Sequence, residues 1–103
     1  LTDIPDHFTF EKGNLVVNGQ VLNGAFHFVA QKRGTVNTGW QTRHFVCAPQ
    51  LRRINYYDPA DRAGQSRGKI AVRHIVHFSA AQRGSVTIVS ESGRIYTLRQ
   101  VPE

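Results

Sequence analysis

The sequence has little of what several classes of protein require. Its one cysteine, Cys47, has no partner for an internal disulfide, so we expect it to be a small buried hydrophobe of an intracellular protein. No apolar run approaches the roughly 20 residues of a membrane-spanning helix, and the first residues lack the basic and apolar segments of a secretory signal. Because no methionine starts the chain, and because it ends abruptly at Val101-Pro102-Glu103, we expect a fragment of a longer protein.

Acidic residues are scarce and are poorly placed for catalysis. None of the seven lies between Gly13 and Tyr57, and no two have the spacing of an acid–base pair, so we expect no enzymatic activity. A metal site would have to draw on the histidines at positions 27, 44, 74 and 77. We expect these to be ordinary surface or edge residues, because His74 and His77 fall on opposite faces of a regular strand. The sequence therefore predicts neither a metal site nor a cofactor.

Short apolar runs separated by turn residues make up most of the chain. No stretch has the 3.6-residue period of a helix together with start and stop signals. Many short strands with turn signals every eight to twelve residues are typical of a sandwich or a barrel, so we expect one all-β domain. The expected strands are 8–10, 15–17, 20–22, 25–31, 40–47, 51–57, 69–72, 73–79, 85–89 and 94–101.

The stretch from Trp40 to Asp58 is expected to be the central hairpin, with its bend at Ala48–Gln50. Alternate residues of a strand point to opposite sides, so Arg43 shares a face with Phe45 and Cys47. This face is apolar at one end and carries a guanidinium towards the other. We therefore expect it to bind an anionic or polar ligand at the mouth of a barrel.

Basic residues near this hairpin form the candidate ligand site of a chain whose net charge is +6. We expect Lys32 and Arg33 to begin a loop, 32–39, in which their side chains and backbone amides face an anion. Further contributions are expected from Arg43, from the hydroxyl of Tyr56 and from Arg67 in a mobile loop, 58–68. The alternative is that Arg43 spans the sheet surface and Tyr56 belongs to the core.

Several of these segments, in this order and spacing, resemble strands of the pleckstrin-homology (PH) family. The segment 21–26, VLNGAF, resembles the opening strand of that family, and 40–46, WQTRHFV, resembles its second. The segments 54–58, INYYD, and 68–72, GKIAV, resemble the third and fourth. The resemblance covers roughly residues 20–101, so we expect an N-terminal extension with short strands at 1–19 and a PH-like domain at 20–103.

This resemblance implies a strongly bent barrel of about seven strands, built from two near-orthogonal antiparallel sheets. It also implies a non-enzymatic module that localises a larger protein by binding a phosphoinositide headgroup or another anionic membrane surface. Such a protein would be cytoplasmic and either peripheral to a membrane or associated with the cytoskeleton. The family pattern has a lysine late in its first strand and a basic-x-Arg pair early in its second. Here the first position falls on Phe28 and the pair reads Gln41-Thr42-Arg43, so we expect weak, salt-sensitive binding.

The family also closes one corner of its barrel with a C-terminal helix, for which this chain has no residues. We expect residues 1–20, a neighbouring chain or a downstream segment to cover that corner, with self-association as one possibility. An acidic protein partner is the main alternative to a lipid ligand. A barrel that binds single-stranded nucleic acid is the second, and it is disfavoured because most aromatic residues share faces with aliphatic ones.

Overall fold

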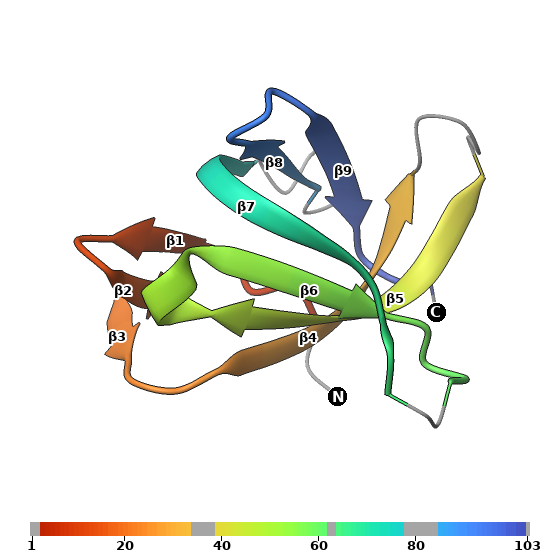
Figure 1. Ribbon diagram of the computed structural model, residues 1–103, viewed down its shortest axis with the longest axis horizontal. Coiled ribbons are helices and arrows are strands. Elements are labelled where there is room, and N and C mark those ends of the chain that lie inside the picture. Colours follow the sequence, from red (N-terminus) through yellow and green to blue (C-terminus); the bar gives the residue numbers. More distant parts are fainter. Residues whose placement is uncertain (1–2, 34–38, 62–63, 78–84, 103) are drawn as a thin grey trace.

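The computed structural model describes residues 3–33, 39–61, 64–77 and 85–102, and they form two antiparallel sheets (Figure 1). The first sheet has three strands: β1 (Phe8–Glu11), β2 (Asn14–Val17) and β3 (Gln20–Leu22). The second closes into a barrel in chain order, because its last strand pairs with its first. Its strands are β4 (Phe26–Arg33), β5 (Trp40–Ala48), β6 (Arg53–Tyr57), β7 (Ser66–His77), β8 (Val86–Ser90) and β9 (Ile95–Arg99).

The expectation of an all-β barrel is therefore confirmed. The only helical element of the described residues is a 3-10 turn, η1 (Pro49–Leu51), at the bend of the central hairpin. Arg52 ends this turn with a φ of 47°, the left-handed conformation that lets the chain reverse into β6. The turn expected at 80–84 and most of the 32–39 connection lie outside the described residues.

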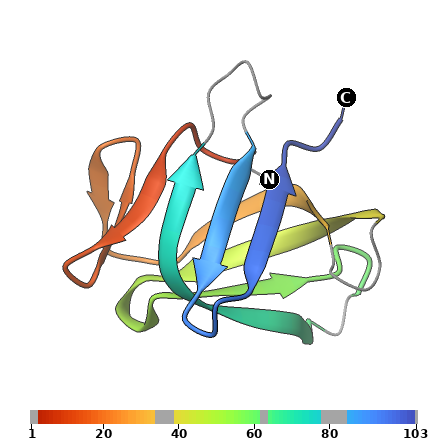
Figure 2. The same ribbon diagram turned by 90° about the horizontal axis from the view of Figure 1, so that it is seen from above.

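Strand β7 differs from expectation, since the sequence predicted two strands meeting at Arg73. The structure has one strand of 12 residues, whose first half pairs with β6 and whose second half pairs with β8. A register shift between Val72 and His74 bends the strand without ending it, as β-bulges do. Figure 2 shows the consequence: β8 and β9, in blue, cross the direction of β4–β6 steeply. One bent strand thus serves both walls of the barrel.

The core follows the alternation of the sequence. Phe45 and Cys47 of β5 and Ile54 and Tyr56 of β6 are buried, so the expected inner face of the hairpin is confirmed. The rings of Phe28 and Phe45 stack with their centroids 5.2 Å apart. Each fully buried large apolar side chain contributes about 1.5–3 kcal/mol. Burial raises the pKa of the Cys47 thiol to about 12, so this residue is a protonated packing group, as expected.

The N-terminal sheet packs on the barrel and shares its core. Ile4, Phe8, Phe10 and Leu15 belong to the same cluster of buried residues as the barrel's inner face. Phe8 is fully buried, and its ring centroid lies 5.4 Å from that of Phe28. The sequence predicted that residues 1–20, a neighbouring chain or a downstream segment would cover apolar surface of the barrel. The N-terminal residues make such an apolar contact, and they do so with strands and without a helix.

Polar contacts hold the N-terminal segment in place at three points. The Ile4 amide donates to Gln100 Oε1 at 3.1 Å, and Gln100 Nε2 donates to the Ile4 carbonyl at 2.9 Å. Arg52 Nη1 donates to the Phe10 carbonyl at 3.1 Å. His77 Nε2 lies 3.0 Å from the Phe8 amide nitrogen and 2.8 Å from the Phe8 carbonyl oxygen, so it accepts from the amide when it carries no proton and donates to the carbonyl when it carries one.

This last contact predicts a pH-dependent stability. Burial, and secondarily the neighbouring His7, lowers the pKa of His77 from its ordinary value of 6.5, outweighing a hydrogen bond to the Phe8 backbone that raises it. A depressed folded-state pKa means that stability is fully present above the unfolded-state pKa and is lost as pH falls through the folded-state pKa. We therefore expect the free energy of unfolding to decrease between pH 7 and pH 5, measured by urea denaturation.

The His77→Gln variant separates this effect from other titrations, because glutamine offers a neutral amide at every pH. It should lose less stability between pH 7 and pH 5 than the wild type does. His74→Gln, at an exposed position of the same strand, is the matched control and should behave like the wild type. Equal pH slopes for wild type and His77→Gln would contradict this role.

Candidate anion-binding site at the barrel mouth

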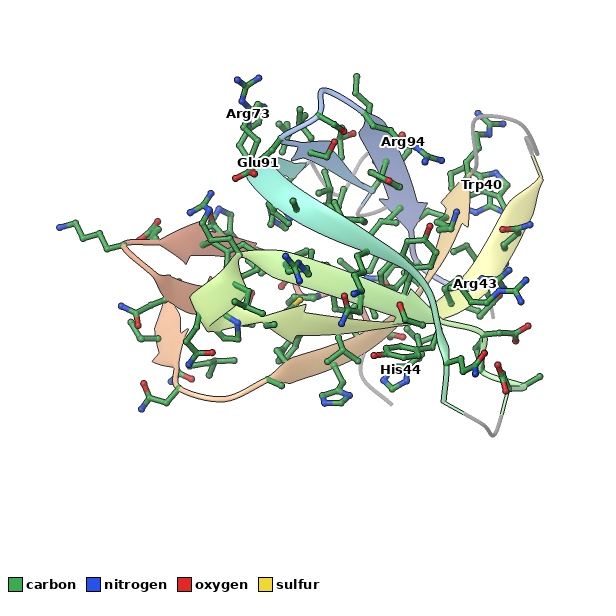
Figure 3. All side chains as sticks on the ribbon, in the orientation of Figure 1. Trp40, Arg43, His44, Arg73, Glu91 and Arg94 are labelled. Carbon is green, nitrogen blue, oxygen red and sulfur yellow. The ribbon has the colours of Figure 1, made fainter. Side chains whose placement is uncertain are left out.

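Side chains from four parts of the chain gather at one end of the barrel interior. Lys32 comes from β4, Arg43 from β5 and Tyr56 from β6, all at inward positions of their strands. Arg94, which directly precedes β9, and the buried Tyr96 complete the group, which we call the basic mouth. The charges of Arg43 and Arg94 both act on Lys32 and on Tyr56, so these groups lie close together. Figure 3 shows Arg94 beside the start of β9 and Arg43 on β5.

Lys32 is the most unusual residue of the mouth because its side chain is only 6% exposed. Its Nζ lies 4.8 Å from the centroid of the Tyr56 ring, a cation–π contact. Burial, followed by the charges of Arg43 and Arg94, lowers the pKa of Lys32. An ammonium in this position has lost much of its water and faces like charges, so an anion entering the mouth would relieve both costs.

Tyr56 supplies both a ring and a hydroxyl to the mouth. Burial and the nearby Tyr96 raise the pKa of Tyr56, whereas the charges of Arg94, Arg43 and Arg67 lower it, and the net direction is upward. The phenol therefore keeps its proton and can donate a hydrogen bond. Gly68 lies directly opposite on β7, where any Cβ would overlap the Tyr56 ring and hydroxyl. Glycine at position 68 thus allows this ring to lie across the strand.

Arg43 is folded back along its own strand. Its Nη1 donates to the Thr42 carbonyl at 2.8 Å, and its Nη2 contacts Gln41 Oε1 at 3.4 Å. Its Nε is buried and has no hydrogen-bond acceptor among the described residues. A buried donor without a partner costs roughly 1–3 kcal/mol. The guanidinium is therefore held near the mouth with part of its bonding capacity unused.

The structure separates residues that the sequence placed together in a loop. Lys32 and Arg33 belong to β4, which continues two residues beyond its expected end and pairs with Gln41 and Trp40 of β5. Their backbones are therefore part of the ladder, and their side chains point to opposite faces. The expectation that both face one anion from a loop is wrong. Lys32 points inward near the end of β4. The resemblance had placed the family's late-strand lysine at Phe28, and Phe28 is a core residue.

Arg33 and Arg67 lie outside the mouth. Arg33 is exposed on the outer face, with its Cζ 5.1 Å from the Trp40 ring centroid, and Arg99 Cζ lies 4.2 Å from the same centroid. Arg67 is exposed at the start of β7, in a segment expected to be a loop, and reaches the mouth only through its charge.

Sequence reasoning missed Arg94 and Tyr96. Arg94 follows the turn Glu91-Ser92-Gly93, and its Cζ lies 4.8 Å from the Tyr96 ring centroid. Only the pairing of β9 with β4, which closes the barrel, brings this segment to Lys32. The signal available in the sequence was a basic residue directly after a tight turn.

Within the described segments, no helix is long and apolar enough to cross a membrane.

Solved structures of PH domains are similar to this chain. The C-terminal PH domain of pleckstrin, crystallised in complex with D-myo-Ins(1,2,3,4,5)P5, superposes with a TM-score of 0.62 and 25% identity, over 75% of this chain and 80% of that chain. The PH domain of human oxysterol binding protein-related protein 11 has a TM-score of 0.60 and 23% identity, over 78% of this chain and 68% of that chain. A solution structure of the C-terminal PH domain of human pleckstrin superposes with a TM-score of 0.60 and 21% identity, over 82% of this chain and 77% of that chain.

These similarities are structural, since no family model and no curated protein matches the sequence. The chain nevertheless has a PH-like fold, as its resemblance to that family predicted. Strands β4 and β5 hold two residues of the basic mouth, Lys32 and Arg43, and the other three come from β6, from position 94 and from β9. The fold-level agreement and the charge arrangement are independent observations, because the first rests on the backbone and the second on side chains.

The Lys32 ammonium is buried and is repelled by the charges of Arg43 and Arg94, so we expect removal of its charge to stabilise the protein. Lys32→Met keeps a long flexible side chain over the Tyr56 ring and removes a buried ammonium that faces two guanidiniums. We expect an increase of roughly 1 kcal/mol in the free energy of unfolding, or a few degrees in melting temperature. Thermal and urea denaturation at pH 7 would measure it.

Lys69→Met is the matched control, because Lys69 is an exposed cation on β7. It changes the net charge equally but should shift the melting temperature by less than Lys32→Met does. If Lys32→Met destabilised the protein while Lys69→Met did not, the ammonium would be a stabilising part of the fold.

Proposed function

We propose that the chain is a binding module whose basic mouth takes a multiply phosphorylated anion, with a phosphoinositide headgroup as the biological ligand. The observation that supports this most is the buried ammonium of Lys32, which lies over Tyr56 and next to Arg43 and Arg94. A protein does not retain like charges in a poorly hydrated pocket without cost, and a phosphate group offsets this cost directly. The inositol pentakisphosphate bound by the similar domain of pleckstrin belongs to the same chemical class.

Each residue of the mouth has a distinct part in this proposal. Lys32 supplies a point charge at the bottom of the site, and the Tyr56 hydroxyl donates to a phosphate oxygen. Arg43 turns away from the Thr42 carbonyl and Gln41 and directs its guanidinium at the ligand, which also gives Nε an acceptor. This rearrangement breaks existing contacts, so it reduces the net affinity.

The expected affinity is therefore low and salt-sensitive. Each basic residue near an anionic membrane contributes on the order of 1 kcal/mol, and the contribution falls off within a Debye length of about 8 Å at physiological salt. Exposed cations such as Arg67, at the start of β7, add attraction to the surface without entering the mouth. Such a module would localise a larger protein to a membrane only together with a second contact.

Liposome sedimentation tests the proposal. Vesicles of phosphatidylcholine with and without 5% phosphatidylinositol 4,5-bisphosphate would be mixed with wild type, Arg43→Ala and Lys32→Gln. We expect the phosphoinositide to increase binding of the wild type, and each variant to lose about tenfold of that increase, because a hydrogen bond to a charged group contributes roughly 1.5–3 kcal/mol. Soluble inositol hexakisphosphate should compete.

Arg33→Ala is the control, since Arg33 carries the same charge on the outer face next to Trp40. It should retain most of the phosphoinositide-dependent binding. Equal losses in Arg33→Ala and Arg43→Ala would indicate non-specific surface attraction. Absence of any difference between the two vesicle compositions for the wild type would remove the mouth as a headgroup site.

A further inference from the structure

A second cavity lies on the outer face of the wall that forms the basic mouth. Its volume is about 410 Å³, and its lining includes His27 of β4, His44 of β5, Tyr57 of β6 and the acidic residues Asp58 and Asp61. His44 follows Arg43 directly, so the two side chains leave β5 on opposite faces, as Figure 3 shows. This cavity is therefore separate from the mouth, and the proposed headgroup site does not use it.

The two histidines of this cavity face each other across the strands. His27 Nδ1 and His44 Nε2 are 3.1 Å apart, and the ring centroids are 5.2 Å apart. Within the β4–β5 ladder, His27 pairs with Val46 and Val29 pairs with His44, so the histidines are diagonal neighbours. Eight consecutive residue pairs fix this register. The nitrogen atoms are thus brought together by the backbone and do not depend on a flexible loop.

The spacing of these nitrogens suits chelation of a metal ion. Bonds of about 2.0–2.1 Å to nitrogens 3.1 Å apart give a nitrogen–metal–nitrogen angle of about 98°. That angle lies between square-planar and tetrahedral geometry and is acceptable to divalent copper, nickel and zinc. The imidazoles currently share one hydrogen bond, in which one ring donates to the other. Rotation of both rings away from the line that joins the two nitrogens would direct both lone pairs at a metal, which replaces the shared proton.

The surroundings of the histidine pair favour a cation. Asp58 and Asp61 line the same cavity in a chain whose net charge is +6. The carboxylate of Asp58 is oriented by a hydrogen bond, in which the Ala60 amide donates to Oδ1 at 2.9 Å. The Asp61 amide donates to the Asp58 carbonyl at 3.0 Å, which keeps both acidic residues in one turn beside the histidines. Carboxylates near a bis-imidazole pair provide negative potential, which attracts a cation.

We propose that His27 and His44 form a chelating site for a divalent first-row transition-metal ion on the outer wall of the barrel. Among the described residues no group of three or more histidine, cysteine or acidic side chains is arranged around one point. The site therefore has two protein ligands, His27 and His44, and water would occupy the remaining positions of the metal ion. The sequence predicted ordinary surface or edge histidines because His74 and His77 fall on opposite faces of a strand. It gave no signal for the pairing of His27 with His44, which follows from the register of β4 and β5.

Isothermal titration with Ni²⁺ tests this proposal, followed by NMR of the imidazole nitrogens to show direct coordination. We expect one Ni²⁺ per chain. His27→Ala and His44→Ala should each weaken binding at least about tenfold, since even the loss of a residue that only orients a metal ligand commonly costs this much. The double variant should resemble either single variant, because a chelate is lost with its first donor. Mg²⁺, which prefers oxygen ligands, should not compete.

His74→Ala is the control, because His74 is an exposed histidine on β7 outside the cavity. It should bind Ni²⁺ as the wild type does. Equal Ni²⁺ affinity in the wild type and the double variant would overturn the proposal, as would equal weakening by His74→Ala. Circular dichroism of each variant shows whether it folds, and broadened His27 and His44 signals in the wild type give a readout that needs no substitution. Failure of this test would leave phosphoinositide binding by Arg43 unaffected.

Discussion

The proposed site at the barrel mouth depends on a buried ammonium, that of Lys32, on which the like charges of Arg43 and Arg94 act. Lys32 is fixed at its place because its backbone pairs with Gln41 on one side and with Leu98 on the other. Its side chain is buried, and Arg43 and Arg94 bring further positive charge to it. An anion bound in the proposed site would offset this electrostatic cost. Such a cost is acceptable only where the rest of the structure supplies stability, as is common at functional sites.

That stability comes from a core that continues beyond the barrel. Residues of β1 and β2 and Ile4 are buried with the inner faces of β4–β9, so the three-stranded sheet and the barrel form one hydrophobic unit. Arg52 illustrates how closely the parts are joined, because it donates to carbonyls of Phe10 and Arg73 and also stacks over the Phe10 ring. The pairing of β4 with β9 keeps Lys32 on the inner face of the barrel, and the shared core stabilises the barrel that this pairing closes.

The faces of individual strands could be predicted from the sequence, and the contacts between strands that are distant in the sequence could not. Alternation in β5 and β6 was sufficient to place Phe45, Cys47, Ile54 and Tyr56 inside, because the period of a strand is a local property. Lys32 and Arg33 precede a glycine and read as a loop, yet pairing on both sides of β4 extends the strand through them. Arg94 and Tyr96 join the mouth through the β4–β9 pairing, for which no local pattern gives a signal. The His27–His44 contact likewise requires the register, and a slip of one residue would separate the rings.

Strand β5 places a guanidinium, proposed to bind an anion, directly before an imidazole, proposed to bind a metal cation. This arrangement sets the electrostatic interaction between the two proposed sites. Arg43 faces the interior and His44 faces the outer cavity, so a bound anion and a bound cation would lie on opposite sides of one sheet layer. Two unit charges about 10 Å apart interact by roughly 1.7 kcal/mol at an effective dielectric constant of about 20. The sign of this interaction is attractive, because a metal on the outer face adds positive potential behind the mouth. Since both ligands would be held by the same β4–β5 ladder, neither site could form if that register were lost.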